Sequence, residues 1–286
     1  MKKKREMDVA LSKIDSLLEN LDTNEETKED NDRISINKGK LIKKIGIIIA
    51  LSKEAEGIIN ELKLKKSNKY NVYPNILYIN DDESVILLVN GLHPKKIPLV
   101  STQFGCIAGY NMVNIIKPDI IINAGTCGGI LYGCQHNTSL LKVNIGDVIM
   151  VDKCYYSDRF IPFEPWKGWD KGNYQLCGYK YICNKLGLKS GHLSTSNSFF
   201  HNDGEKEFYI KHDVIVKDME CCAIADICDI FDVKLIGIKG VTDIVGNPAG
   251  HEQFIENLKT TCDNITLYTV KTVNLIKGKN TNYLEC

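Results

Sequence analysis

The sequence predicts an α/β fold, a three-layer α/β/α sandwich around a twisted, mostly parallel mixed sheet. Short apolar runs rich in β-branched residues recur along the chain, as expected of strands buried on both faces. Segments of helical length separate these runs, and strands that alternate with helices build a sheet covered by helices. With 286 residues, of which 43% are hydrophobic, the chain can bury a sizeable core.

The strands are expected where an apolar run is followed by a turn or a helix. In chain order they are residues 45–50, 85–89, 119–123, 145–151 and 234–239. The helices are expected where the apolar pattern has helical length. They are residues 53–63, 99–116, 219–231 and 251–277. The second helix should end at Lys117, because a residue before proline is disfavoured in helical backbone.

The first 40 residues differ in composition from the rest of the chain. Apolar residues at helical spacing predict a short amphipathic helix around residues 8–21. Residues 22–33 contain almost nothing to bury, so we expect them to be disordered. The extension, residues 1–40, is either a solvated tail or a docking or oligomer-contact helix. The folded domain is predicted for residues 41–279.

Charge and cysteine content exclude several classes of function. Lysine plus arginine equals aspartate plus glutamate at 36 each, so the formal net charge is zero, and the sequence lacks the basic surface that binds nucleic acid or anionic membranes. No apolar run reaches the roughly 18 residues of a membrane span. The 11 cysteines are scattered and have no zinc-site spacing. We expect reduced thiols, no metal, no cofactor and a cytoplasmic protein.

Two carboxylates follow predicted strands. In a largely parallel sheet, ligands bind beyond the carboxyl ends of the strands, and Glu54 and Asp243 stand just after the strands at 45–50 and 234–239. Glu54 could act as a general base, or it could only complement the helix dipole. A buried Asp243 could hold and donate a proton, or it could only form a turn.

Two further segments are candidate ligand contacts. Residues 123–129 read NAGTCGG, and glycines let a backbone approach a ligand closely, although the segment could also be a tight turn. It matches neither a dinucleotide-binding nor a triphosphate-binding loop. Glu220 opens a helix of small residues, where a carboxylate could bind ribose hydroxyls or could only cap the helix.

Six segments, taken in order, resemble the 5'-methylthioadenosine/S-adenosylhomocysteine nucleosidase family, within the purine nucleoside and uridine phosphorylase superfamily. They are residues 45–57, 117–129, 144–160, 193–200, 217–233 and 237–246. The most specific are KPDIIINAGTCGG at 117–129 and the combination of DME at 218–220 with TD at 242–243. Plant-type nucleosidases look most similar. The resemblance implies a nucleoside phosphorylase-like fold for the domain and a homodimer.

The resemblance also implies a role for each matching residue. Glu54 would position and activate the attacking water, and Asp243 would donate a proton to N7 of adenine. Glu220 would hold the ribose hydroxyls. The other implied substrate contacts are Thr126 beside the water and sugar, Met219 against the sugar, Phe199 stacked on the purine, the backbone near Phe200 at the base edge, and Tyr156, with Tyr155, in a loop that reaches the neighbouring subunit's 5'-substituent pocket.

The chemistry agrees with these roles. Protonated adenine leaves more easily than neutral adenine, and its departure builds positive charge on the sugar, as in glycoside hydrolysis. Anionic Glu54 and Glu220 would stabilise that charge, while Asp243 must hold its proton at the same pH. The sequence therefore predicts metal-free hydrolysis of the N-glycosidic bond of 5'-methylthioadenosine, with S-adenosylhomocysteine as a second candidate substrate.

Two alternatives stay open. A phosphorylase of the same superfamily needs cations for phosphate, and the domain offers Lys95, Lys96 and Arg159, whereas Glu54 would repel phosphate. A non-catalytic nucleoside-binding protein would not need Glu54 and Asp243, and both are present.

The sequence also departs from the family pattern at three places. Many relatives have His at the position of Ser157, and relatives often have Gly-Asp in place of Ser196–Asn197. The stretch Gly91–Gln103 replaces a glycine-rich region near the sugar. These changes leave the acid and the base in place and bear on substrate choice.

Overall fold

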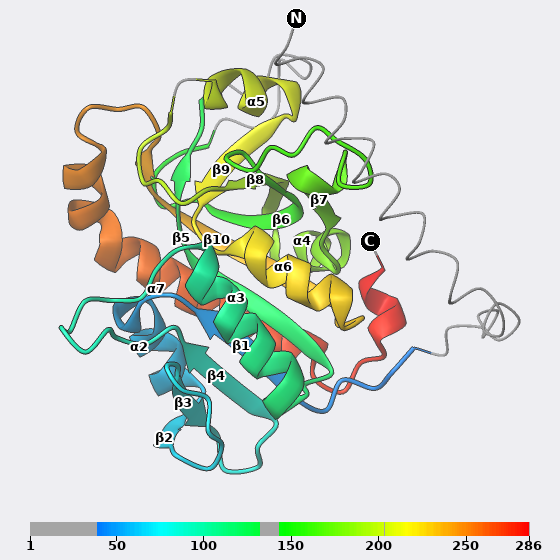
Figure 1. Cartoon of the computed structure of the whole chain (residues 1–286). Coiled ribbons are helices and arrows are strands. Elements are labelled where there is room, and N and C mark those ends of the chain that lie inside the picture. Colours follow the sequence, from blue (N-terminus) through cyan, green and yellow to red (C-terminus); the bar gives the residue numbers. More distant parts are fainter. Residues whose placement is uncertain (1–38, 132–142, 203, 286) are drawn as a thin grey trace, which may run out of the picture. The chain divides into compact units, whose positions relative to one another are not determined.

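A mixed ten-stranded sheet organises the computed structural model, which describes residues 39–131, 143–202 and 204–285 (Figure 1). The strands are β1 Ile45–Ile49, β2 Lys65–Ser67, β3 Ile76–Ile79, β4 Val85–Val89, β5 Ile120–Gly129, β6 Val148–Tyr156, β7 Gly172–Gln175, β8 Lys189–Thr195, β9 Val214–Asp218 and β10 Leu235–Ile244. The predicted helix at 8–21 and the disordered segment at 22–33 lie outside the described residues.

The sheet combines two parallel groups. One group is β4-β1-β5-β10 and the other is β6-β8-β9. Antiparallel pairs of β10 with β6 and of β5 with β9 join the groups and close a ring of the strands β5, β10, β6, β8 and β9, with β1 and β4 outside it. Further antiparallel pairs add β3, β2 and β7 at the edges. The predicted α/β class and mixed sheet are confirmed.

Helices cover both faces of this sheet. They are α2 Ser52–Glu61, α3 Thr102–Asn111, α4 Tyr179–Leu186, α5 Glu205–Lys211, α6 Cys221–Ile230 and α7 Gly250–Ile276. One buried cluster joins the sheet to α2, α4 and α7, and a second joins it to α3 and α6. The predicted helix at 99–116 continues past α3 as a π-helical turn, Met112–Ile116. No helix in the described part of the chain has the length and apolarity to span a membrane.

Side-chain alternation explains why the predicted strands are apolar without a break. On β1, Ile45, Ile47 and Ile49 belong to the cluster with α2 and α7, whereas Ile48 belongs to the cluster with α3 and α6. Each face of a strand takes every second residue, so a strand covered on both faces is apolar throughout. Full burial of one isoleucine stabilises the fold by roughly 1.5–3 kcal/mol.

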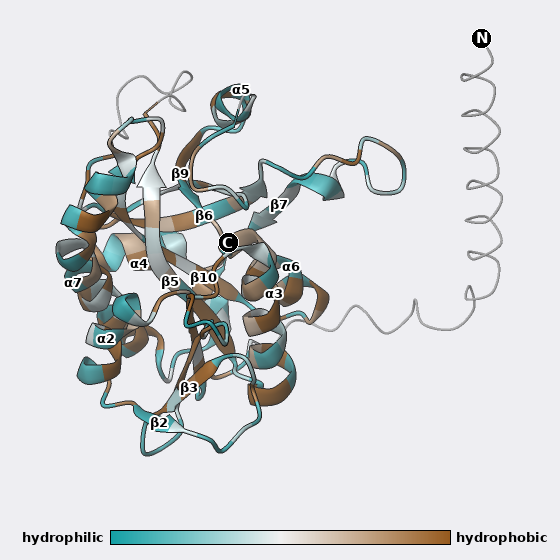
Figure 2. Cartoon of the chain, turned by 60° about the vertical axis from the view of Figure 1, so that its left-hand side comes forward, coloured by the Kyte–Doolittle hydropathy of each residue, from teal (hydrophilic) through white to brown (hydrophobic). Residues whose placement is uncertain are grey.

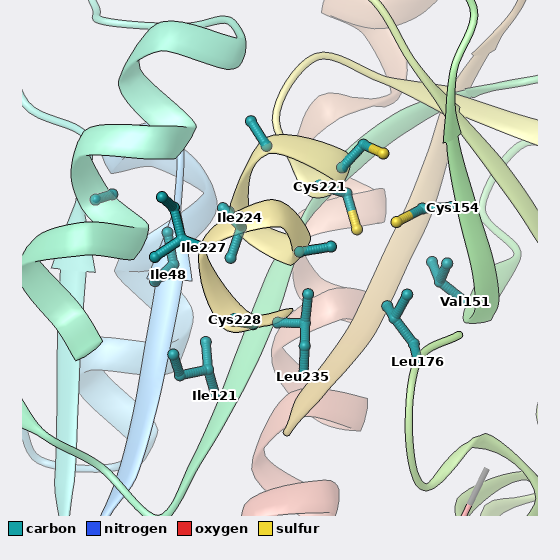
Figure 3. Close-up of a cluster of buried hydrophobic side chains, with 14 of the residues drawn as sticks. Ile48, Ile121, Val151, Cys154, Leu176, Cys221, Ile224, Ile227, Cys228 and Leu235 are labelled. Atoms are coloured by element: carbon teal, nitrogen blue, oxygen red, sulfur yellow. The ribbon is translucent and has the colours of Figure 1, made fainter. Parts of the chain in front are cut away.

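Helix α6 packs through small and branched side chains, as its sequence predicts. Ile224 and Cys228 belong to the buried cluster that also contains Ile121 and Leu235 of the sheet (Figure 3). Polar residues instead mark the outer turns of α2 and α7 (Figure 2). Helix α6 therefore packs its apolar side chains on the sheet. Its N-terminal end lies at one edge of a cavity.

Two strands run further than the sequence predicts. Strand β5 continues to Gly129 and β10 to Ile244, because the two stay paired along this length. Gly128 allows the close approach, since a Cβ there would lie 2.7 Å from Val245 Cγ2. The predicted strand ends at 123 and 239 are therefore too early. The predicted loop at Tyr155 and Tyr156 is wrong, because both residues lie on β6, where pairing with β8 extends to Tyr156.

Candidate active site

A cavity of about 280 Å³ opens where β1, β5, β9 and β10 end. Residues from all four strand ends line it, together with the start of α7 and the loop after β8. Of the predicted site residues, those that line the cavity are Glu54, Thr126, Phe199, Met219, Glu220 and Asp243. Tyr156 and Phe200 are not among the lining residues. Residues far apart in the sequence thus meet at the edge of the sheet where a parallel strand arrangement places a ligand.

Glu54 lies in the first turn of α2 and is only 2% exposed. Its Oε1 accepts hydrogen bonds from Thr126 N at 2.8 Å and Thr126 Oγ1 at 2.6 Å. Its Oε2 accepts from Leu51 N at 3.0 Å. Three donors from two strand ends therefore hold the carboxylate against the cavity wall, where it can accept a proton from a water molecule.

Asp243 lies near the end of β10 and is buried. Its Oδ1 accepts a hydrogen bond from Thr242 Oγ1 at 2.8 Å. Burial raises the pKa of Asp243, and the hydrogen bond from Thr242 only partly opposes this shift. A carboxyl group with a raised pKa keeps its proton to higher pH, which a general acid requires.

Glu220 stands at the N-cap of α6, beside Met219 at the cavity. Its Oε1 accepts a hydrogen bond from Ser101 N at 2.7 Å. Burial raises the pKa of Glu220 to about 7, Asp218 and Glu54 add to the shift, and the Ser101 hydrogen bond and Lys239 oppose it. This carboxyl group therefore changes charge near neutral pH.

Ser101 orients Glu220 from an uncommon backbone conformation. Its φ is 100°, in the region that residues other than glycine rarely adopt. Such strain persists where the surrounding structure enforces it, and it is found at binding sites. Ser101 lies in the divergent stretch Gly91–Gln103, so this stretch supplies a backbone donor to the candidate sugar-binding carboxylate.

Aromatic side chains form one side of the cavity. Phe199 lies edge-to-face with Phe254 at 6.1 Å and with His251 at 6.4 Å between ring centroids, and all three line the cavity. Phe200 packs edge-on against Phe199 at 5.2 Å. Ring edges and faces of this kind favour stacking with a flat aromatic ligand.

Tyr156 lies away from this cavity. Its hydroxyl donates to Asp226 Oδ2 at 2.6 Å, and the Arg159 guanidinium stacks on its ring at 4.0 Å. Arg159 also donates to Asp226 and to the backbone oxygens of Trp169 and Asp170. These contacts commit Arg159 to a second, separate pocket, which it lines together with Tyr156 and Asp226.

Two lysines line the cavity, and each has a buried carboxylate partner. Lys239 Nζ lies 2.8 Å from Asp218 Oδ2, and Lys217 Nζ lies 3.2 Å from Glu205 Oε2. Lys95 and Lys96, proposed from the sequence as phosphate contacts, do not line it. Among the residues that the structure describes, the cations at this cavity are thus already paired, which favours water over phosphate as the co-substrate.

The two lysines were missed in the sequence, although a signal for them exists. Lys239 ends the predicted strand 234–239 directly after the run LIGI at 235–238, and Lys217 follows the apolar run 214–216 directly. A lysine is almost never fully buried without a partner, so a lysine at such a position indicates a buried carboxylate nearby. The partner itself could not be named from the sequence.

Comparison with known proteins adds three findings. Residues 44–274 match the family model described as "Phosphorylase superfamily". The chain is 33% identical over 245 residues to a 5'-methylthioadenosine/S-adenosylhomocysteine nucleosidase of Arabidopsis thaliana, covering 83% of this chain and 93% of that protein. It is 29% identical over 246 residues to a 5'-methylthioadenosine nucleosidase of the same plant, covering 84% and 89%.

A solved structure agrees with these matches. The apo form of 5'-methylthioadenosine nucleosidase from Arabidopsis thaliana superposes with a TM-score of 0.78 at 29% identity, covering 86% of this chain and 100% of that one. Sequence and fold therefore agree over nearly the whole described domain.

Proposed function

The chain belongs to the 5'-methylthioadenosine/S-adenosylhomocysteine nucleosidase family of the phosphorylase superfamily, and we propose that it hydrolyses the N-glycosidic bond of 5'-methylthioadenosine. The products would be adenine and the 5-thio-substituted ribose. The observation that carries this proposal is the placement of Glu54, Glu220 and Asp243 around one cavity, with a raised pKa at Asp243.

The three carboxyl groups divide the reaction between them. Asp243 donates its proton to N7 of adenine, the bond between C1' and N9 breaks, and its electron pair stays on the purine. Water attacks C1' and gives a proton to Glu54. Glu220 accepts hydrogen bonds from the ribose hydroxyls, and its charge, with that of Glu54, stabilises the cationic sugar in the transition state.

The purine would occupy the aromatic side of the cavity. Phe199 supplies a ring for stacking, and Met219 would pack against the sugar. Thr126, already bonded to Glu54, would lie beside the attacking water. The backbone near Phe200 would meet the base edge. Tyr156 and Tyr155 would serve a 5'-substituent pocket through contact with a second subunit.

We also propose that the protein is a homodimer. Large hydrophobic side chains are exposed on one face, namely Ile107 and Tyr110 on α3 and Ile230 and Phe231 at the end of α6. Exposed apolar patches on a folded domain commonly mark a subunit interface. Sedimentation equilibrium should give twice the chain mass, and a fully active monomer would contradict the proposal.

A cytoplasmic location is the third part of the proposal. Cys127, Cys154, Cys221 and Cys262 carry free thiols, and reduced thiols are typical of the cytosol. Cell fractionation with antibody detection tests this, and recovery in a secreted or membrane fraction would contradict it.

The experiment that tests the function measures adenine release from 5'-methylthioadenosine in phosphate-free buffer and again with phosphate. Release without phosphate, unchanged by adding it, supports a nucleosidase with Glu54 as base. Release only with phosphate would make the protein a phosphorylase. No release in either buffer would contradict the activity and favour a nucleoside-binding role. S-adenosylhomocysteine is assayed in parallel as the second candidate substrate.

A further inference from the structure

A buried ion pair that the reaction above does not use lies beneath the loop carrying Phe199 and Phe200. Lys217 is the second-to-last residue of β9 and Glu205 begins α5, and each is only 4% exposed. Lys217 Nζ lies 3.2 Å from Glu205 Oε2 and 3.4 Å from Oε1. Burying two charges is costly unless further hydrogen bonds satisfy them, so the other partners of this pair indicate what it holds in place.

The further partners lie on the loop itself. Lys217 Nζ donates to the backbone oxygen of Phe200 at 3.1 Å. Glu205 Oε2 accepts from the backbone N of Asn202 at 2.6 Å. The ion pair therefore fixes the chain on both sides of His201, immediately after the two phenylalanines.

The pair also connects the loop to the end of β6. Ser157 Oγ donates to Glu205 Oε1 at 2.5 Å, at one of the positions where the sequence departs from its relatives. The start of the loop has a separate anchor, since Asn197 Oδ1 accepts from Thr102 N and Oγ1 and Asn197 N donates to Asp158. The loop is thus fixed before and after Phe199–Phe200.

Apolar burial contributes little to holding this loop. Phe199 is 39% exposed and Phe200 is 57% exposed, so much of their apolar surface still faces water. Apart from the ring contacts of Phe199 with His251 and Phe254, polar contacts hold the loop. After the rings, the hydrogen bonds of Phe200 O and Asn202 N go to Lys217 and Glu205, and Asn202 Nδ2 also donates to Ser198 Oγ at 3.4 Å.

We propose that Lys217 and Glu205 are positioning residues that fix residues 198–202 over the purine side of the cavity, and so set the affinity for the substrate rather than the rate of bond cleavage. The inference rests on the proposed function for its substrate. Glu54, Glu220 and Asp243 lie on other elements and have no hydrogen bond to the pair in the described structure, so the chemistry should not depend on it directly.

The first test is the steady-state kinetics of Lys217→Met, with Lys217→Arg as the conservative variant and Lys259→Met as the control. Lys259 forms an exposed pair with Asp263 at 2.8 Å and should be neutral. Lys217→Met should raise KM by about tenfold or more, with kcat changed less than about threefold, as expected when binding rather than transition-state contacts are lost. Lys217→Arg should recover most of the affinity.

A second readout does not depend on activity. Chymotrypsin cuts after phenylalanine, so its rate of cleavage after Phe199 and Phe200 reports how firmly the loop is held. Lys217→Met should be cut faster than the wild type, and Lys259→Met should not. If the wild type releases no adenine, the proposed function fails, but this comparison still decides whether the pair holds the loop.

The double variant Lys217→Met/Glu205→Leu separates positioning from mere stability. Removing both charges avoids an unpaired buried ion, so Tm should recover relative to Lys217→Met alone. KM and cleavage should not recover, because Phe200 and Asn202 stay without their partners. Recovery of KM together with Tm would overturn the inference, as would an unchanged KM and cleavage rate in Lys217→Met.

Discussion

The two sides of the cavity are built in different ways. On one side, Glu54 and Asp243 belong to strand ends and a helix start, and paired backbone holds them in place. On the other side, Phe199 lies on a loop that an ion pair and a few polar contacts hold. Under the proposed function, the sheet would position the groups of bond cleavage, whereas purine recognition would depend on a loop held by the Lys217–Glu205 pair.

The largest effect is expected at the acid. Asp243→Asn removes the proton that N7 must receive, so kcat on 5'-methylthioadenosine should fall by about 10²-fold or more, with KM little changed. Initial rates of adenine release measure this, and Asp263→Asn, at an exposed ion pair, is the control. A near-normal rate would remove Asp243 from the acid role.

The base should show the next largest effect. Glu54→Gln keeps one acceptor oxygen, which can serve Thr126, but its amide NH2 cannot accept from Leu51 N or take a proton from water, so kcat should fall by about 10²-fold. Single-turnover rates measured with enzyme in excess over substrate isolate this step. If Glu54→Gln hydrolyses at the wild-type rate, the strand-end side of the cavity does not supply the base.

Phe199→Ala should weaken substrate binding without slowing bond cleavage, so KM should rise while kcat stays nearly unchanged. Stacking of a base on an aromatic ring is worth about 1–3 kcal/mol, so KM should rise by roughly tenfold. Phe199→Trp, which keeps an aromatic face, should stay within about threefold of the wild type. A loss of kcat equal to that of Asp243→Asn would mean that Phe199 contributes to bond cleavage and not only to purine binding.

The smallest effect is the response to pH. Glu220 has a pKa of about 7, raised by burial, Asp218 and Glu54 and opposed by the Ser101 hydrogen bond and Lys239, and its charged form accepts from the ribose hydroxyls. Because a lower pH protonates it, kcat/KM should fall by about five- to tenfold from pH 7.5 to pH 6. Burial raises the pKa of Asp243, and loss of its proton as the pH rises through that pKa should lower kcat/KM in the opposite direction.

A pH profile of Glu220→Gln provides the check on that assignment. The variant cannot ionise at this position, so its acidic limb should disappear even though its overall kcat/KM is lower. An acidic limb that persists unchanged in Glu220→Gln would assign the titration to another group.

Local sequence patterns predicted several of the buried elements. Strand β1 and helices α2, α6 and α7 were expected within a few residues of where they occur, because buried apolar runs and helical spacing are properties of neighbouring residues. Strands β8 and β9 were not predicted. Strand β8 carries Gly191 and His192, and β9 has an apolar run of only three residues before Lys217, so neither gives a strong strand signal.

The sequence by itself determined the α/β class, the carboxylates placed near strand ends and the residue types that suit proton transfer, because all of these can be inferred from short stretches of chain. Only the tertiary structure decided which groups meet. Ser101 and Glu220 are 119 residues apart, and Thr126 and Glu54 are 72 residues apart. Such partners are brought together by strand order and by the pairing of β5 with β10, which depend on contacts across the whole domain and leave no periodic pattern in the sequence.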